Sequence, residues 1–166
     1  MAAYFLHRIG LCKIFTEAGG ISMKVLVING ANMNLLGKRE PDIYGSETLA
    51  DLEKTIRKEA EKLQMDCSLS FLQSNHEGEI IDAIHQAMED KTDAIILNPG
   101  AFTHYSYAIR DAIKATGIRT VEVHMSNIHS REEFRSHSVI APVCVGQISG
   151  FGFKSYLAAL YLLRSV

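Results

Sequence analysis

An arginine and a tyrosine share one short segment, and together they could supply a base. Arg39 and Tyr44 stand five residues apart in the run REPDIYG, which follows an apolar stretch and a Gly/Asn-rich turn. A tyrosine with its ordinary pKa of about 10 is almost fully protonated at neutral pH and is a poor base. A guanidinium beside the phenol favours the phenolate. The segment therefore favours a tyrosinate base, with an ordinary surface loop as the alternative interpretation.

A glutamate and a histidine could supply the matching acid. Glu122 and His124 stand two residues apart at the end of a predicted strand. Residues at this spacing lie on the same side of a strand, so the carboxylate could orient the imidazole and stabilise its charged form. Such a pair suits a general acid. A polar pair that is merely hydrogen-bonded at a strand end is the alternative.

Two further arginines favour a small anionic substrate. Arg131 and Arg135 stand four residues apart, so a short helix would present both on one face. With Arg39 they give three guanidinium groups suited to a carboxylate, although arginines on a surface helix are usually only solvated. A phenolate base, an oriented imidazole and these arginines describe proton abstraction beside a carbonyl and protonation of a leaving group. That reaction is an elimination.

The alternation of strand and helix patterns predicts how these residues are positioned. The predicted strands cover 24–29, 67–73, 93–98, 118–123 and 142–148, and the helices 49–63, 80–88, 106–116 and 154–163. This order is typical of an α/β fold in which one five-stranded parallel sheet carries helices on both faces. In such sheets the ligand site lies at the carboxyl ends of the strands, where Asn, His, Ser and Gly gather in this chain.

The composition describes one globular domain. The chain has 166 residues, of which 47% are hydrophobic and 22% charged, and its net charge is −2. That balance, without a basic run, argues against nucleic acid and anionic membranes as partners, and the apolar runs are too short to span a membrane. The three cysteines have no CxxC spacing, which fits a reducing, cytoplasmic setting.

The first 22 residues differ from the remainder. They have no small-x-small cleavage pattern and make a poor signal peptide. Met23 opens a strand pattern, so we interpret residues 1–22 as an extension, non-native or loosely ordered, and residues 23–166 as a single catalytic domain. A folded N-terminal helix is the competing interpretation.

Two other kinds of site fit the sequence less well. His76, His104, His124 and His129 invite a metal site, but there is no HExxH motif and no Cys/His pair at zinc-finger spacing. The turn at 29–34 is neither a GxGxxG motif nor a P-loop. The alternative function is a non-catalytic flavodoxin-like module that binds a nucleotide or phosphorylated metabolite at the same edge.

Long segments of the chain resemble the type II 3-dehydroquinate dehydratases. These segments are NGANMNLLGKREPDIYG, QSNHEGEIIDAIHQA, LNPGAFTHYSYAIRDAI, and EVHMSNIHSREEFRSHS followed by VGQISGFG. The resemblance implies a flavodoxin-like three-layer sandwich that eliminates water from 3-dehydroquinate, through an enolate, to give 3-dehydroshikimate in the shikimate pathway. It implies no metal and no organic cofactor. It also implies a homo-oligomer, typically a dodecamer built from trimers.

The resemblance further implies a role for each site residue. Tyr44 would be the base, with Arg39 lowering its pKa, and Asn32 would hold a water at the enolate oxygen. His124 would protonate the departing hydroxyl, with Glu122 orienting it. The expected substrate-binding residues are Asn98, His104, Met125, Ser126, Arg135, Arg131 as part of a lid, and Asp111 from a neighbouring subunit. The sequence leaves open whether the pathway runs in the biosynthetic or the quinate-degrading direction.

Overall fold

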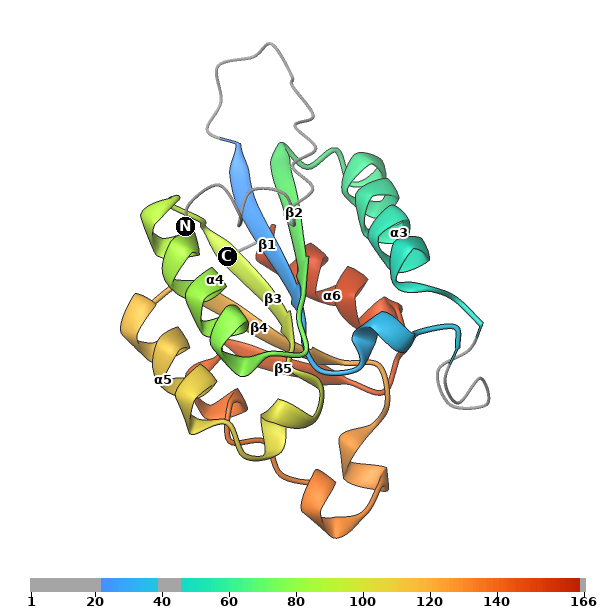
Figure 1. Ribbon diagram of the computed structural model, residues 1–166. Helices are drawn as coiled ribbons and strands as arrows, with labels where there is room; N and C mark the ends of the chain where they lie inside the picture. Colours follow the sequence, from blue (N-terminus) through green and yellow to red (C-terminus); the bar gives the residue numbers. More distant parts are fainter. Residues whose placement is uncertain (1–21, 39–45, 165–166) are drawn as a thin grey trace.

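The computed structural model describes residues 22–38 and 46–164. Within this part of the chain, five parallel strands form one central sheet (Figure 1). They are β1 (Met23–Asn29), β2 (Cys67–Gln73), β3 (Ala94–Asn98), β4 (Arg119–His124) and β5 (Gly146–Ser149). Their order is β2-β1-β3-β4-β5, which confirms the predicted doubly wound sheet. The order reverses between β1 and β3, where such folds bind their ligands.

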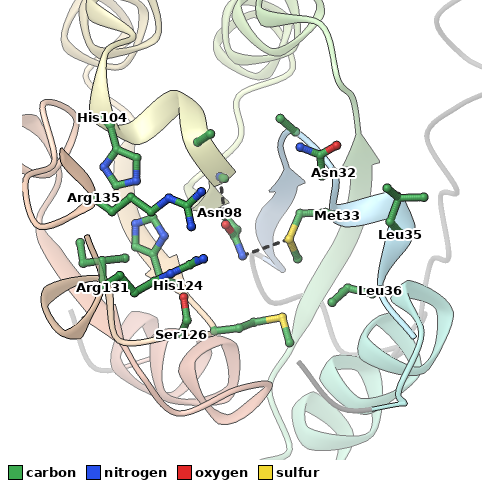
Figure 2. Close-up of a pocket in the computed structure, with 15 residues that line it drawn as sticks. Asn32, Met33, Leu35, Leu36, Asn98, His104, His124, Ser126, Arg131 and Arg135 are labelled. Carbon is green, nitrogen blue, oxygen red and sulfur yellow. Dashed lines mark hydrogen bonds between the residues drawn. The ribbon is translucent and has the colours of Figure 1, made fainter. Parts of the chain in front are cut away.

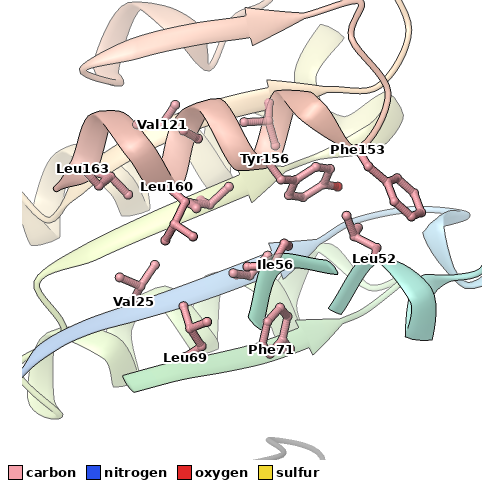
Figure 3. Packing of buried hydrophobic residues seen from close by; sticks show 14 of the residues in the cluster. Val25, Leu52, Ile56, Leu69, Phe71, Val121, Phe153, Tyr156, Leu160 and Leu163 are labelled. Atoms are coloured by element: carbon pink, nitrogen blue, oxygen red, sulfur yellow. The ribbon is translucent and has the colours of Figure 1, made fainter. Parts of the chain in front are cut away.

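Two pairs of helices cover the two faces of the sheet. Helices α3 (Leu49–Lys62) and α6 (Lys154–Leu163) lie on one face, and α4 (Glu77–Glu89) and α5 (Tyr107–Thr116) lie on the other (Figure 1). Alternate residues of β1 point into the two apolar layers, as a strand buried on both faces requires. Figure 3 shows the layer between the sheet, α3 and α6. Among the described residues, no helix combines the length and the apolar character that crossing a membrane requires.

Short-range signals set the helix ends. The sequence TLAD at 48–51 has the pattern of a capping box, and the structure confirms it: the Thr48 hydroxyl accepts from the Asp51 N–H at 3.2 Å, and Asp51 accepts from the Thr48 N–H at 2.9 Å. Ser106 caps α5 by accepting from the Ile109 N–H at 2.9 Å. Gly117 follows the predicted helix 106–116 and ends α5 in the left-handed conformation.

The fifth strand is shorter than predicted. Residues Ala141–Val143 form a 3-10 turn, η5, and β5 begins only at Gly146. Pro142 has no N–H and cannot donate to a strand ladder, so the predicted strand 142–148 is wrong for its first four residues, 142–145. Cys144 consequently lies outside the strand, whereas Cys67 is buried at the start of β2, which has the predicted range 67–73.

Two glycines let the loops after β1 and β3 approach each other. A Cβ on Gly30 would overlap the Pro99 carbonyl, and a Cβ on Gly100 would lie 2.7 Å from the Ala31 carbonyl oxygen. Gly100 also has a φ of +61°, which favours glycine. The Gly30 N–H donates to the Asn98 carbonyl at 2.7 Å. This close approach places the two loops side by side at the switch point of the sheet.

Candidate active site

A pocket of about 170 Å³ opens at the carboxyl ends of β1, β3 and β4 (Figure 2). Its walls come from residues 31–36 after β1, residues 98–104 after β3, and residues 124–135 at the end of β4 and beyond it. These are three of the strand ends at which the sequence predicts a shared site. The pocket therefore lies at the switch point, where an open α/β sheet binds its ligand.

Most of the predicted site residues meet at this pocket. Those that line it are Asn32, Asn98, His104, His124, Met125, Ser126, Arg131 and Arg135. Glu122 lies directly behind His124, fully buried. Asp111 is exposed on α5 and is not among the lining residues. The predicted base Tyr44 and its partner Arg39 lie outside the described residues.

The predicted Glu122–His124 pair is present. His124 Nε2 lies 2.5 Å from Glu122 Oε1, and the two residues are 6% and 0% exposed. Alternation along β4 places both side chains on the same side of the strand, as the spacing predicts. The hydrogen bond fixes the orientation of the imidazole at the wall of the pocket, and a carboxylate is an acceptor that suits a protonated ring.

Three neutral side chains complete the surroundings of Glu122. Thr103 Oγ1 and Gln147 Nε2 donate to Oε1 at 2.7 and 2.8 Å, and Ser138 Oγ donates to Oε2 at 2.9 Å. Burial alone would raise the pKa of Glu122, but the hydrogen bond and charge of His124 and the bonds from Thr103 and Gln147 hold this pKa below its usual value. Glu122 is therefore ionised at neutral pH.

Ser138 is itself held by the backbone. Its hydroxyl oxygen accepts from the N–H groups of Ile140 and Ala141 at 3.1 and 2.9 Å, which leaves its proton for Glu122. Sequence reasoning missed Thr103, Ser138 and Gln147 as part of the site. All three stand within the motif segments, but they are 16 to 25 residues from Glu122, so no local spacing connects them with it.

His104 has one ring nitrogen committed to the backbone. Its Nδ1 lies 2.8 Å from the carbonyl oxygen of His137, and because a carbonyl only accepts, Nδ1 carries the proton. The ring also meets the Phe134 ring edge-on, with 6.4 Å between centroids. The other nitrogen, Nε2, is thus left for a ligand.

The arginines reach the pocket by a different route from the one predicted. Arg131 and Arg135 do not share a helix: Arg131 is an extended residue directly after the 3-10 turn η3 (Ile128–Ser130), and Arg135 ends a second 3-10 turn, η4 (Glu133–Arg135). Exposed Glu132 lies 3.5 Å from Arg135 Nη1 and 3.8 Å from Arg131 Nε. Exposed ion pairs of this kind are weak, so a ligand anion can compete for both guanidinium groups.

The pocket as a whole suits an anion. Arg131, Arg135, His104 and His124 lie along one wall, and among the described residues that line the pocket none is acidic (Figure 2). The opposite wall carries Asn32 with Met33, Leu35 and Leu36, which are apolar. The arrangement fits a small anionic molecule with one apolar face. Within the described residues, no group of three or more His, Cys, Asp or Glu side chains is placed to hold a metal ion.

The backbone of Asn32 has an unusual conformation and is held by a side chain that follows β2. Its φ of 68° is left-handed, a conformation that asparagine tolerates better than most residues. Its N–H donates to Asn75 Oδ1 at 2.8 Å, and Gln73 Nε2 donates to the same oxygen at 3.1 Å. The end of β2 therefore supports the loop after β1, although it does not line the pocket.

Comparison with known protein families gives one consistent result. The family model described as dehydroquinase class II matches residues 23–164. A 3-dehydroquinate dehydratase of Caldicellulosiruptor bescii is 64% identical over 143 residues, which cover 86% of this chain and 97% of the relative.

Solved structures agree with this result. The crystal structure of a type II dehydroquinase from Butyrivibrio crossotus is similar with a TM-score of 0.83 and 50% identity, covering 87% of this chain and 99% of the other. A type II dehydroquinase from Propionibacterium acnes gives a TM-score of 0.82 and 40% identity, covering 89% of this chain and all (100%) of the other.

Proposed function

The chain belongs to the dehydroquinase class II family and is a hydro-lyase that dehydrates 3-dehydroquinate, and we propose that the reaction runs through an enolate, with Tyr44 as base and His124 as acid. The observation that carries the proposal is the buried Glu122–His124 pair, 2.5 Å apart, at the wall of a pocket rich in positive charge. Removal of water gives 3-dehydroshikimate, and the step belongs to the shikimate pathway.

The acid half of the reaction rests on described residues. His124 gives its proton to the hydroxyl that leaves, so that the group departs as water rather than as hydroxide. Glu122 keeps the ring oriented and, because it remains ionised, compensates the imidazolium charge before the transfer. The enolate electrons then form the new carbon–carbon double bond, conjugated with the re-formed ketone.

The base half is assigned to the segment around Tyr44. The phenolate takes a proton from the carbon next to the ketone, and Arg39 lowers the pKa of the phenol so that the phenolate is available. Asn32, which lines the pocket, holds a water that donates to the enolate oxygen. Tyr44 then releases its proton to solvent and His124 takes up a proton from solvent, which restores both groups for the next turnover.

Substrate recognition is assigned to the remaining lining residues. In this proposal Arg135, Ser126 and the backbone at Met125, which all line the pocket, bind the carboxylate and hydroxyl oxygens, and Arg131 closes over the bound molecule. Asn98 and His104 supply a further N–H donor and a ring nitrogen. The absence of an acidic side chain among the described lining residues supports an anionic substrate.

Addition of 3-dehydroquinate to the purified protein tests the activity. We expect a rise in near-ultraviolet absorbance as the conjugated enone forms, and we expect turnover to survive borohydride, since the mechanism has no imine. The matched control is His124→Asn, which keeps a polar side chain but loses the acid. No turnover in folded wild type, with thermal stabilisation by flavin mononucleotide and none by quinate-like acids, would favour the nucleotide-binding module instead.

We also propose that the enzyme works in the cytoplasm as a homo-oligomer built from trimers. Exposed Asp111 stands on α5, one turn after exposed Tyr107, and does not line the pocket of its own chain, which supports a role toward a neighbouring copy. Sedimentation velocity is expected to give twelve or a smaller multiple of three subunits. A monomer with full turnover would contradict a shared site.

A further inference from the structure

A buried tyrosine behind the pocket joins the ends of two strands. Tyr156 of α6 is 0% exposed. Its hydroxyl donates to Asn29 Oδ1 at 2.6 Å and accepts from Asn98 Nδ2 at 2.8 Å. Asn29 and Asn98 end β1 and β3, and they are partners in the parallel register. A single phenol therefore connects both strand ends at the switch point, and only Asn98 of these three residues lines the pocket. Figure 3 shows the ring of Tyr156 in the layer between α6 and the sheet.

The contacts of Asn98 fix which end of its amide faces which neighbour. The Gly100 N–H, which can only donate, lies 3.1 Å from Oδ1, so the oxygen faces Gly100. The nitrogen then faces Tyr156. The tyrosine has one proton, which goes to Asn29, so its oxygen is free to accept from Asn98. The contacts at Oδ1 and at Nδ2 therefore indicate the same orientation of the Asn98 amide.

The phenol stays protonated in this role. Burial raises the pKa of Tyr156, and the hydrogen bond from Asn98 offsets only part of that rise. The hydroxyl can therefore donate and accept at once throughout the physiological pH range.

The second N–H of Asn98 is held only weakly. Nδ2 lies 3.5 Å from Met33 Sδ, and a thioether sulfur is a weak acceptor. Met33 and Asn98 both line the pocket, and Figure 2 shows their side chains facing each other. An oxygen atom of a bound molecule would replace this sulfur contact with a stronger hydrogen bond.

We propose that Tyr156 is a positioning residue for the substrate: it acts through Asn98 and fixes the amide so that an N–H, rather than the oxygen, faces an acceptor oxygen of bound 3-dehydroquinate. The inference rests on the proposed function and deepens it. Without the hydroxyl the amide nitrogen loses the acceptor of its other N–H, and only the Gly100 N–H at Oδ1 is left to hold the orientation that the substrate meets.

Kinetic comparison of two phenylalanine variants of the same helix tests the inference. Tyr156→Phe removes the hydroxyl, and Tyr161→Phe makes the same change at a residue that is 54% exposed. We expect about a ten-fold loss of kcat/KM for Tyr156→Phe, as for one oriented hydrogen bond, and none for Tyr161→Phe. In an Asn98→Ala background Tyr156→Phe should cause no further loss, because the residue acts only through that amide.

The outcomes separate this inference from the function on which it rests. No turnover by folded wild type contradicts the proposed function, and calorimetric binding of 3-dehydroquinate to wild type and Tyr156→Phe then still tests the positioning role. Wild-type kinetics in Tyr156→Phe, or an undiminished loss in the Asn98→Ala background, would overturn the inference. If Tyr156→Phe does not fold, a crystal structure of the wild type with product bound tests the inference. Nδ2 of Asn98 should then lie within hydrogen-bonding distance of a product oxygen. An Asn98 amide that contacts no product atom would overturn the inference.

Discussion

The carboxylate of Glu122 accepts hydrogen bonds from His124, Thr103, Gln147 and Ser138, and it is fully buried. A buried carboxyl with no donors would hold its proton, because burial disfavours the charged form. Here the donors outweigh burial and the pKa falls below its usual value. The residue that orients the proposed acid is thus kept charged first by His124 itself, and then by Thr103 and Gln147, two neutral side chains that do not line the pocket.

This lowered pKa has a consequence for acid stability. The folded protein binds a proton at Glu122 less tightly than the unfolded chain does, so the stabilisation is fully present above the ordinary glutamate pKa of 4.5 and is lost as the pH falls through the lower folded value. We expect the melting temperature of wild type to fall more steeply with acid below pH 4.5 than that of Glu122→Gln. Thermal unfolding followed by circular dichroism at a series of pH values measures both slopes.

A matched control separates this site from carboxylates in general. Glu89→Gln makes the same change at an exposed residue of α4 and should keep the wild-type slope. Parallel curves for wild type and Glu122→Gln would contradict the proposed ionisation of Glu122.

At the scale of elements, the close approach of two loops shapes the pocket. Gly30→Ala would place a Cβ against the Pro99 carbonyl, which is backbone and cannot move aside without shifting the loop after β3. We expect a loss of about 2 kcal/mol in stability, the usual range for overpacking, together with a loss of substrate affinity. Chemical denaturation and the KM for 3-dehydroquinate measure the two effects.

Gly78→Ala is the control for this change. Gly78 lies in the first turn of α4 and a Cβ there meets nothing within 4 Å, so alanine should leave stability unchanged or raise it by up to about 1 kcal/mol through helix propensity. A Gly30→Ala protein as stable and as active as Gly78→Ala would show that the loops have room to separate.

Elements marked by local signals could be predicted from the sequence, and elements that depend on the fold could not. The strand β2, the capping box of α3 and the extent of α6 follow from short-range pattern, and the structure agrees with each. The sequence predicts the start of the fifth strand too early, because the apolar residues before Gly146 extend the strand pattern back to Pro142, which cannot join a ladder. Four-residue spacing alone predicts one helix for the arginine pair, because it does not reveal the two extended residues, Arg131 and Glu132, between the two turns.

The same division holds for the candidate site. Glu122 and His124 could be paired from the alternation of a single strand, and the sheet topology could place the strand ends together. Tyr156 could not be predicted as a partner of Asn98 or Asn29, because 58 and 127 residues separate them and only the packing of α6 brings them into contact. Buried hydrogen bonds between distant segments leave no periodic signal in the sequence.

At the scale of the whole molecule, the catalytic unit is expected to be complete from Met23 onward. The family match covers residues 23–164, and the apolar layers seen among the described residues lie within that range. The Met23 N–H donates to the Asp66 carbonyl at 3.0 Å, a bond that a free amino terminus at Met23 can also make. A chain beginning at Met23 should therefore keep the kcat/KM and melting temperature of the full chain. An aggregated or inactive product would mean that residues 1–22 contribute to the fold.

The most direct test of the account is the rate of enone formation from 3-dehydroquinate by wild type and Tyr44→Phe, followed in the near ultraviolet. Phenylalanine keeps the ring and removes the proposed base. We predict that wild type turns over in the presence of borohydride and that Tyr44→Phe, folded and of the same oligomeric size, loses at least about 100-fold in kcat, as expected for the loss of a catalytic base. A Tyr44→Phe protein with the wild-type rate would contradict the phenolate mechanism.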